Sequence, residues 1–347
     1  MVEGGVSTND PSVGPMISIV VPCYNEEQSL PILYRELTSA FATRPNFDYE
    51  LVFVDDGSTD RTAEILEGLA VANRRVTVIT LSRNFGHQSA ISAGLERASG
   101  DAVILCDADL QDTPEVMLQM INRWRDGADV VYAVRGRRQA SAIKRAAYHV
   151  FYRLLNRVTD VGIPADAGDF SLMDRKVVDA INGLPECNRF IRGLRAWVGY
   201  DQYPLPYDRP ARRVGESKYS LTRLLRLAFD GIFDFSTKPL TIIFFLGLAS
   251  SALSVAGFAF FLAHRFIGFK VFGHSPEEVP GITSVVLAVF FVGGVQLLSV
   301  GVVGEYIGRI YREVKRRPTF IVKAVSGPAD RAGPGRQSPG SGVAGPE

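Results

Sequence analysis

The chain has 347 residues, of which 46% are hydrophobic, and a formal net charge of +1. This length allows two domains, and a nearly neutral chain without a recognisable nucleic-acid-binding module argues against a nucleic-acid partner. The three cysteines, Cys23, Cys106 and Cys187, lack the spacing of metal ligands, so we interpret them as reduced thiols in a reducing compartment.

Both ends of the chain are rich in Gly, Pro and Ser and poor in large apolar side chains. Segments of this composition bury too little apolar surface to offset the entropy of ordering. We therefore expect residues 1–15 and 324–347 to be disordered.

Residues 16–217 alternate short β-branched runs with longer helical patterns. The predicted strands are Ile17–Val21, Leu51–Val54, Val76–Thr80, Ala102–Cys106 and Val130–Ala133. The predicted helices are Glu27–Ala42, Thr62–Ala72, Gln88–Ala98 and Pro114–Asp126. Strands separated by helices predict an α/β fold with a mainly parallel, Rossmann-like sheet whose ligands bind beyond the carboxyl ends of the strands. No G-x-G-x-x-G pattern follows the first strand, which disfavours hydride transfer with a dinucleotide.

Polar residues that suit a nucleoside follow the first two strands. A tyrosine can stack on a base, and nearby acid and amide groups can read the polar edges of the base or ribose. Helix capping by residues 58–60 is an alternative that is compatible with this role. The candidate nucleotide-binding residues in these turns are Pro22, Tyr24, Asn25, Glu26 and Asp55.

The fourth predicted strand leads directly into Asp107, Ala108 and Asp109. Two carboxylates spaced by one residue at the exit of a buried strand can converge on a hard divalent cation such as Mg²⁺. The alternative for an isolated Asp-x-Asp is a solvated turn, but its position after a strand favours the metal site.

A basic stretch and two amphipathic segments follow the fifth strand. Residues 135–145 carry Arg135 and four further cations that could hold an anionic acceptor, with a solvated basic surface as the alternative. Lys144–Val158 and Leu221–Phe235 have helical amphipathic spacing, and the second, within residues 218–238, suits a helix lying in a membrane interface. Packing against the sheet is the alternative for both segments.

Two long runs without charged residues predict transmembrane helices at residues 239–264 and 279–305. Each run exceeds the roughly 20 residues that are needed to cross hydrocarbon, and buried core helices are the alternative. Lys and Arg concentrate before the first run and within residues 306–323, whereas the connection at residues 265–278 is poor in them. The positive-inside rule therefore predicts that both termini and the large N-terminal portion are cytoplasmic. Glycines at close-packing spacing in the second run are compatible with a homo-oligomer or with helix packing inside one chain.

The ordered motifs VVPCYNEE, VDDGSTD and CDADLQD resemble those of family 2 glycosyltransferases with the GT-A fold. The segments SRNFGHQSAISAGL, DAGDFSLMDRKVVDAI and GESKYS, together with the two apolar runs, resemble the polyprenyl-phosphate glycosyltransferases. This resemblance covers about residues 16–322.

The resemblance implies roles for individual residues. Asp107 and Asp109, assisted by Gln111, would hold Mg²⁺ or Mn²⁺ and the donor diphosphate, which places Asp107 in the nucleotide site and Asp109 in the catalytic centre. Asp169 matches the position of a catalytic base or acceptor-side carboxylate. The residues matched to a loop that approaches the diphosphate or lipid phosphate are Arg212, with Arg213 as the alternative, Ser217 and Lys218.

The resemblance also implies the reaction. We expect inverting transfer of a hexose from a nucleotide-sugar, with UDP-glucose favoured, to a polyprenyl phosphate at the cytoplasmic face of a bacterial inner membrane. UDP-N-acetylhexosamine, UDP-galactose and GDP-mannose remain open as donors. The alternatives are a processive polysaccharide synthase, which lacks support because no Gln-x-x-Arg-Trp element is present, and a non-catalytic nucleotide-binding membrane protein.

Overall fold

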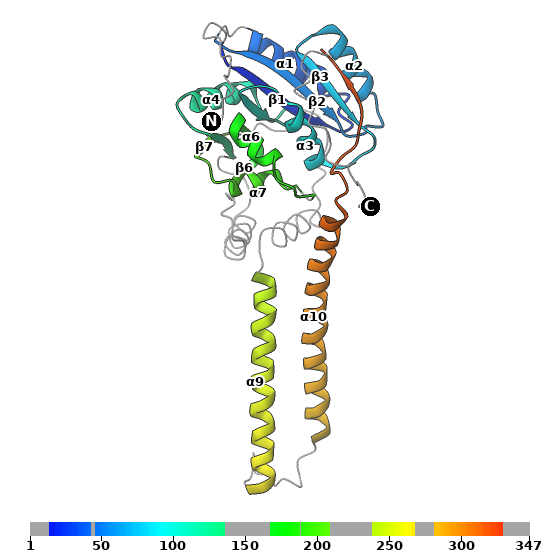
Figure 1. Ribbon diagram of the computed structural model, residues 1–347, viewed down its shortest axis with the longest axis vertical. Helices are drawn as coiled ribbons and strands as arrows, with labels where there is room; N and C mark the ends of the chain where they lie inside the picture. The colour runs from blue at the N-terminus through cyan, green and yellow to red at the C-terminus, as the bar shows by residue number, and fades with distance from the viewer. Residues whose placement is uncertain are drawn as a thin grey trace, which may run out of the picture. The chain divides into compact units, whose positions relative to one another are not determined.

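The computed structural model describes residues 14–42, 46–135, 167–187, 189–208, 238–267 and 281–328 (Figure 1). The chain divides into two compact units. One contains the sheet and includes the C-terminal residues from Pro318 onward, and the other contains the two long helices.

A mixed eight-stranded sheet organises the first unit, with the order β7-β5-β6-β4-β1-β2-β3-β8. Strands β1 to β4 form a parallel core, whereas β6 is antiparallel to both of its neighbours, β4 and β5. The strand bounds are β1 Met16–Cys23, β2 Asp48–Asp55, β3 Val76–Leu81, β4 Ala102–Leu105, β5 Val130–Arg135, β6 Ala167–Asp174, β7 Gln202–Tyr207 and β8 Val322–Ser326. The predicted α/β class with a mainly parallel sheet is confirmed.

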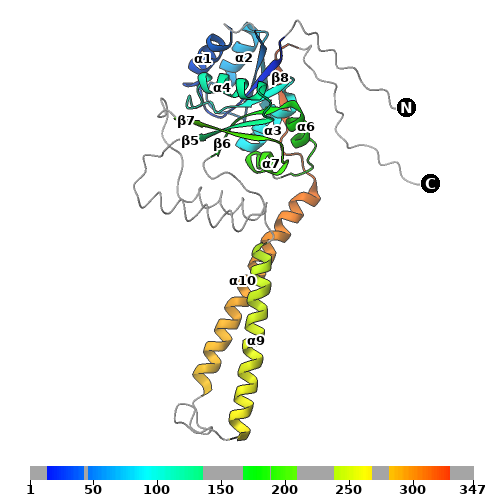
Figure 2. The ribbon, with the colours of Figure 1, turned by 90° about the vertical axis from the view of Figure 1, so that its left-hand side faces the viewer.

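Helices cover both faces of this sheet. One face carries α1, α2 and α4, and the other carries α3, α6 and α7 (Figure 2). Their bounds are α1 Leu30–Ala42, α2 Thr62–Ala72, α3 His87–Arg97, α4 Pro114–Arg125, α6 Arg175–Asn182 and α7 Ile191–Trp197. Because both faces are covered, the central strands are nearly continuous apolar runs, as in MISIVVPC of β1.

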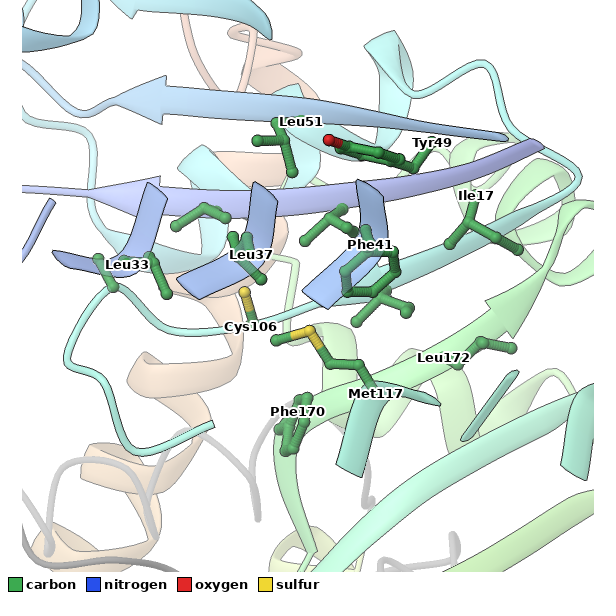
Figure 3. Close-up of a cluster of buried hydrophobic side chains, with 14 of the residues drawn as sticks. Ile17, Leu33, Leu37, Phe41, Tyr49, Leu51, Cys106, Met117, Phe170 and Leu172 are labelled. Atoms are coloured by element: carbon green, nitrogen blue, oxygen red, sulfur yellow. The ribbon is translucent and has the colours of Figure 1, made fainter. Parts of the chain in front are cut away.

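The core on the α1 face explains why this region folds. Leu33, Leu37 and Phe41 recur every four residues along α1 and point toward the sheet (Figure 3). Met117 of α4 and Phe170 of β6 belong to the same buried cluster. Burial of each such side chain stabilises the fold by roughly 1.5–3 kcal/mol, so the parallel core is held mainly by apolar contact.

All five predicted strands and all four predicted helices of the first half are present, with bounds that shift by a few residues. Strands β6, β7 and β8 were not predicted. The two prolines in QYPLPY of β7 disfavour a central strand but are tolerated in β7, which lies at the edge of the sheet.

The C-terminal tail requires a correction. Residues 324–347 were expected to be disordered, but Ala324, Val325 and Ser326 belong to β8, which pairs antiparallel with β3. The unpaired backbone groups of β3 are the physical reason, because an open strand edge accepts another strand whose side chains alternate.

The second unit contains α9, Lys238–Ile267, and α10, Gly281–Lys315, which contact each other. Both helices are long and apolar enough to cross a membrane. Large apolar side chains are exposed along them, including Phe244 at 65% and Leu297 at 76%. Water disfavours apolar surface of this extent, and lipid accommodates it. Helix α10 continues to Lys315, so part of the basic segment predicted at residues 306–323 is helical.

Close contact between α3 and the sheet yields a test of the packing. A Cβ on Gly94 would lie 2.2 Å from Val20 Cγ1 and 3.2 Å from Val54 Cγ2. We expect Gly94→Ala to lower the free energy of unfolding by about 1–3 kcal/mol, because the added methyl group overpacks this contact. Thermal unfolding of the purified chain measures the change.

The matched control is Gly68→Ala in α2, where a Cβ meets nothing within 4 Å. This substitution should stabilise the helix by roughly 0.5–1 kcal/mol, because glycine is a poor helix former. Equal effects of the two substitutions would contradict the close approach of α3 to β1.

Candidate active site

Asp107 and Asp169 come together because of the strand register. Leu105 of β4 pairs with Ser171 of antiparallel β6, and continuation of this register for two residues places Asp107 opposite Asp169. Residues opposite each other in an antiparallel pair direct their side chains to the same face. Both residues line one small pocket, together with Pro22, Cys106 and Phe170 among others.

Helices α3 and α7 hold the carboxylate of Asp169 from two sides. Gln88 Nε2 donates to Asp169 Oδ2 at 3.3 Å, and Gln88 Oε1 accepts a hydrogen bond from the Ile191 N–H at 2.8 Å. Arg192 Nε lies 3.5 Å from Asp169 Oδ1. Burial alone raises the pKa of Asp169, but Arg192, His87 and Arg195 outweigh it and hold the pKa well below its usual value. Asp169 is therefore ionised at neutral pH.

His87 lies between the two carboxylates. Its Nε2 is 3.6 Å from Asp107 Oδ1 and 3.7 Å from Asp169 Oδ2. Burial lowers the pKa of His87, whereas the close carboxylates of Asp169 and Asp107 raise it, with a net result of about 9. The two carboxylates therefore favour the protonated form of the imidazole, which lies between them.

The turn after β4 contains the predicted metal ligands. The Asp107 side chain is 38% exposed, whereas Asp109 is buried and its Oδ1 accepts a hydrogen bond from the Gln111 N–H at 3.2 Å. Leu110 has a φ of 62°, which turns the chain sharply. Buried Asp112 was not predicted, and its Oδ2 accepts a hydrogen bond from the Asp107 N–H at 3.0 Å.

These residues fit a metal site that is completed by substrate. Within the described residues, no group of three or more His, Cys, Asp or Glu side chains could hold a metal ion. Mg²⁺ at phosphate sites commonly takes only one or two carboxylates and fills its shell with phosphate oxygens and water. The partly exposed carboxylate of Asp107, which lines the pocket, matches this pattern.

The turns after β1 and β2 are locked together by hydrogen bonds. The Thr59 N–H donates to Asn25 Oδ1 at 2.8 Å, and the Asn25 N–H donates to Ser58 Oγ at 3.0 Å. Asp55 is buried and accepts a hydrogen bond from the Ser58 N–H at 3.0 Å, while Tyr24 remains 39% exposed. Asn25 and Asp55 thus shape the turns, and the Tyr24 ring is open to a ligand.

The carboxylate of Glu26 also serves the local structure. It accepts a hydrogen bond from Ser29 Oγ at 2.6 Å, and the Glu26 N–H donates to Thr62 Oγ1 at 2.8 Å. The proposed contacts of Pro22, Tyr24, Asn25, Glu26 and Asp55 with a nucleoside stay predictions.

Sequence reasoning missed the anchor of His87. Buried Asp56 accepts hydrogen bonds from the Phe85 and Gly86 N–H groups at 2.7 and 2.9 Å. Burial raises the pKa of Asp56, and these two hydrogen bonds oppose the rise. Asp56 therefore fixes the residues that precede His87, and Gly86, with a φ of 102°, permits the turn.

Four missed residues surround Asp169: His87, Gln88, Arg192 and Arg195. The first two lie in the motif SRNFGHQSAISAGL, which contributed to the resemblance. The motif therefore pointed to this segment but did not show that it contacts Asp169. Nothing local in the sequence connects the arginines of α7 with Asp169.

Several predicted residues lie outside the described part of the structure. Arg212, Arg213, Ser217, Lys218 and the amphipathic segments Lys144–Val158 and Leu221–Phe235 belong to this group. Arg135 ends β5, but its side chain is not described. Their proposed contacts with phosphate or membrane stay predictions.

Comparison with known proteins assigns the family. The description glycosyl transferase family 2 matches residues 18–181. An uncharacterized glycosyltransferase of Synechocystis sp. is 45% identical over 90% of this chain and 96% of the relative. A prophage-derived bactoprenol glucosyl transferase of Shigella flexneri is 42% identical over 88% of this chain and 97% of the relative. Among solved structures, a mannosyltransferase of Pyrobaculum calidifontis in complex with GDP-Man and Mn²⁺ is 18% identical over 88% of each chain, with a TM-score of 0.47. At this level of identity with full-length relatives, the chain belongs to glycosyltransferase family 2.

Proposed function

We propose that the chain transfers glucose from UDP-glucose to a polyprenyl phosphate and forms a polyprenyl-monophosphate sugar with inversion at the anomeric carbon. The observation that carries the proposal is that Asp107 and Asp169 line one small pocket and both contact His87. Relatives named bactoprenol glucosyl transferase, similar over nearly their whole length, support the sugar and the acceptor.

Asp107 and Asp109, with Gln111 beside them, are the residues that would hold Mg²⁺ or Mn²⁺ with the donor diphosphate. A cation there stabilises the negative charge that the leaving nucleotide gains as the glycosidic bond breaks. Asp112 orients this turn through its hydrogen bond to the Asp107 N–H. Tyr24 and the turns after β1 and β2 would receive the uridine, and Arg212, Ser217 and Lys218 would approach the phosphates.

The acceptor does not require a strong base. A phosphate monoester has a second pKa near about 6, so it is largely ionised at neutral pH and can attack directly. Asp169 is a poor base because its cationic neighbours hold its pKa below the usual range. Its role in this proposal is to position the acceptor and the sugar.

Helices α9 and α10 would bring the enzyme to its lipid substrate. The cations at both flanks of these helices, and the few cations between them, support an orientation with the catalytic unit and both termini in the cytoplasm of a bacterium. This orientation gives the site access to cytoplasmic nucleotide-sugars.

A donor panel tests the reaction. Radiolabelled UDP-glucose, UDP-galactose, UDP-N-acetylglucosamine and GDP-mannose are each mixed with Mn²⁺, polyprenyl phosphate and inverted membrane vesicles that contain the chain. We expect label from UDP-glucose to enter the organic phase as a monosaccharide lipid. Right-side-out vesicles should not react with external donor, because the site faces the cytoplasm. Label that stays aqueous, or is incorporated into a polymer, would contradict the proposal.

Substitution of Asp107 tests the metal site. We expect Asp107→Asn to lower the transfer rate by roughly 100-fold or more, because a metal-binding carboxylate is lost. Calorimetric titration of Mn²⁺ in the presence of UDP should show weaker binding. Asp126→Asn, whose side chain is 67% exposed at the end of α4, is the control and should keep both properties. Unchanged Mn²⁺ binding by the Asp107 variant would exclude Asp107 as a ligand.

The ionisation of Asp169 leads to a pH test. A depressed pKa keeps this carboxylate charged as the pH falls through the neutral and mildly acidic range, so it should add no limb to the rate profile between about pH 5 and 9. We expect Asp169→Asn to lose transfer activity at every pH in this range. Recovery of activity by the Asn variant at high pH would show that Asp169 acts as a base, because a more fully ionised acceptor would then compensate for the missing carboxylate.

A further inference from the structure

Helix α7 places two arginines beside one carboxylate. Arg192 Nε lies 3.5 Å from Asp169 Oδ1, and Arg195 Nη1 donates to the carbonyl oxygen of the adjacent Gly168 at 3.4 Å. The charge of Arg195 also acts on Asp169. Two arginine cations of α7 therefore act on the one carboxylate of Asp169 from the side that faces this helix.

Arg195 has hydrogen-bonding capacity that the protein does not use. Arg195 is only 1% exposed, and its guanidinium lies 5.1 Å from the centroid of the Tyr132 ring. Its Nε and Nη2 atoms have no hydrogen-bond partner among the described residues, and Arg192 Nε has only its ion pair with Asp169 Oδ1. Burial, followed by the charge of Arg192, lowers the pKa of Arg195 to about 10, which leaves it a cation at neutral pH.

A buried guanidinium N–H without a hydrogen-bond partner destabilises the folded protein, because it has lost its hydrogen bond to water and gained no other. A carboxylate or phosphate satisfies such donors well, since the planar fork of arginine matches two oxygens of an anion. Within the described ranges, Asp169 is the only acid in contact with this pair, and its carboxylate also contacts Gln88 and His87.

We propose that Arg192 and Arg195 form a phosphate-binding site next to Asp169, and that its occupant is the phosphate monoester of the lipid acceptor. Arg192, whose side chain is 21% exposed, is the contact group, and Arg195 supplies a second, buried charge behind it. This inference rests on the proposed function and assigns the acceptor end of that site.

The order of these contacts favours the acceptor phosphate, and not the donor diphosphate, as the ligand of the two arginines. Asp107, His87, Asp169 and Arg192 follow one another in a line of ion pairs. The donor diphosphate belongs to the Asp107 end of this line. In a single displacement the nucleophile and the leaving group lie on opposite sides of the anomeric carbon, so the two phosphates need separate sites. The α7 arginines occupy the other end.

The test uses the full chain purified in detergent and the variants Arg192→Met and Arg195→Met. The probe acceptor is citronellyl phosphate, a short isoprenyl phosphate monoester, with UDP-glucose as the donor. We expect Arg192→Met to raise the acceptor KM by about tenfold, the effect of losing one charge-assisted hydrogen bond. Arg195→Met should raise the acceptor KM by a smaller factor, because it removes only the more distant charge. Both variants should leave the donor Kd within about twofold. Removal of one partner of a buried ion pair destabilises a protein, so the melting temperature of each variant is measured beside its KM, and Arg192→Lys, which keeps the charge, remains measurable if a methionine variant does not fold.

Arg189→Lys is the matched control. Arg189 is a buried arginine of the same segment, but its Nη2 donates to the carbonyl oxygens of Ile181, Asn182 and Leu184, which end α6 or follow it. This variant should lower the melting temperature without changing the acceptor KM. Arg192→Lys should fall between wild type and Arg192→Met, because it keeps the charge and loses the fork.

A second readout separates this inference from the proposed function. Inorganic phosphate should raise the melting temperature of the wild type and of Arg189→Lys, but not of the two methionine variants. If no polyprenyl phosphate is glycosylated while this pattern holds, the proposed function fails and the anion site stands. If transfer occurs and the methionine variants keep the acceptor KM, or lose donor affinity instead, the assignment of the site to the acceptor is overturned.

Discussion

The antiparallel pairing of β6 with β4 is the constraint on which the site depends. The parallel strands β1 to β4 bring their carboxyl ends to one edge of the sheet, and these strands alone would present Asp107 and the turns after β1 and β2 but not Asp169. Insertion of β6 in the opposite direction brings a second acid, Asp169, to the same edge from a distant part of the chain. A slip of this register by one residue would turn Asp169 to the other face of the sheet.

Electrostatics then determines what these two acids can do. Asp169 is mostly buried, whereas the Asp107 side chain is 38% exposed. Neighbouring carboxylates without counterions would raise each other's pKa. His87 between them and Arg192 beyond them reverse this effect for Asp169. The result is an alternation of charges from the turn after β4 to α7. Such a line keeps a carboxylate ionised and oriented, which suits positioning of an acceptor that is already a nucleophile.

The residues that support this line lie in the turns after β2 and β4 and at the start of α3. Asp56 holds the backbone before His87, Gln88 joins α3 to the start of α7, and Asp112 holds the turn of Asp107. All three are side chains with short hydrogen bonds to backbone N–H groups or to Asp169. Each functional group is therefore oriented by a neighbour that need not touch substrate itself.

The sequence alone determined the first five strands, the helices between them, the two long apolar helices and the family, because these depend on local periodicity and on ordered motifs. It also singled out Asp107, Asp109 and Asp169 as candidates. Only the tertiary structure decided that Asp107 faces Asp169, that His87 and Arg192 neutralise them, and that Ala324–Ser326 join β3. The reason is physical: strand register, edge pairing and the meeting of charges from α3, α7 and β6 arise from contacts between distant segments, and no spacing along the chain encodes such contacts.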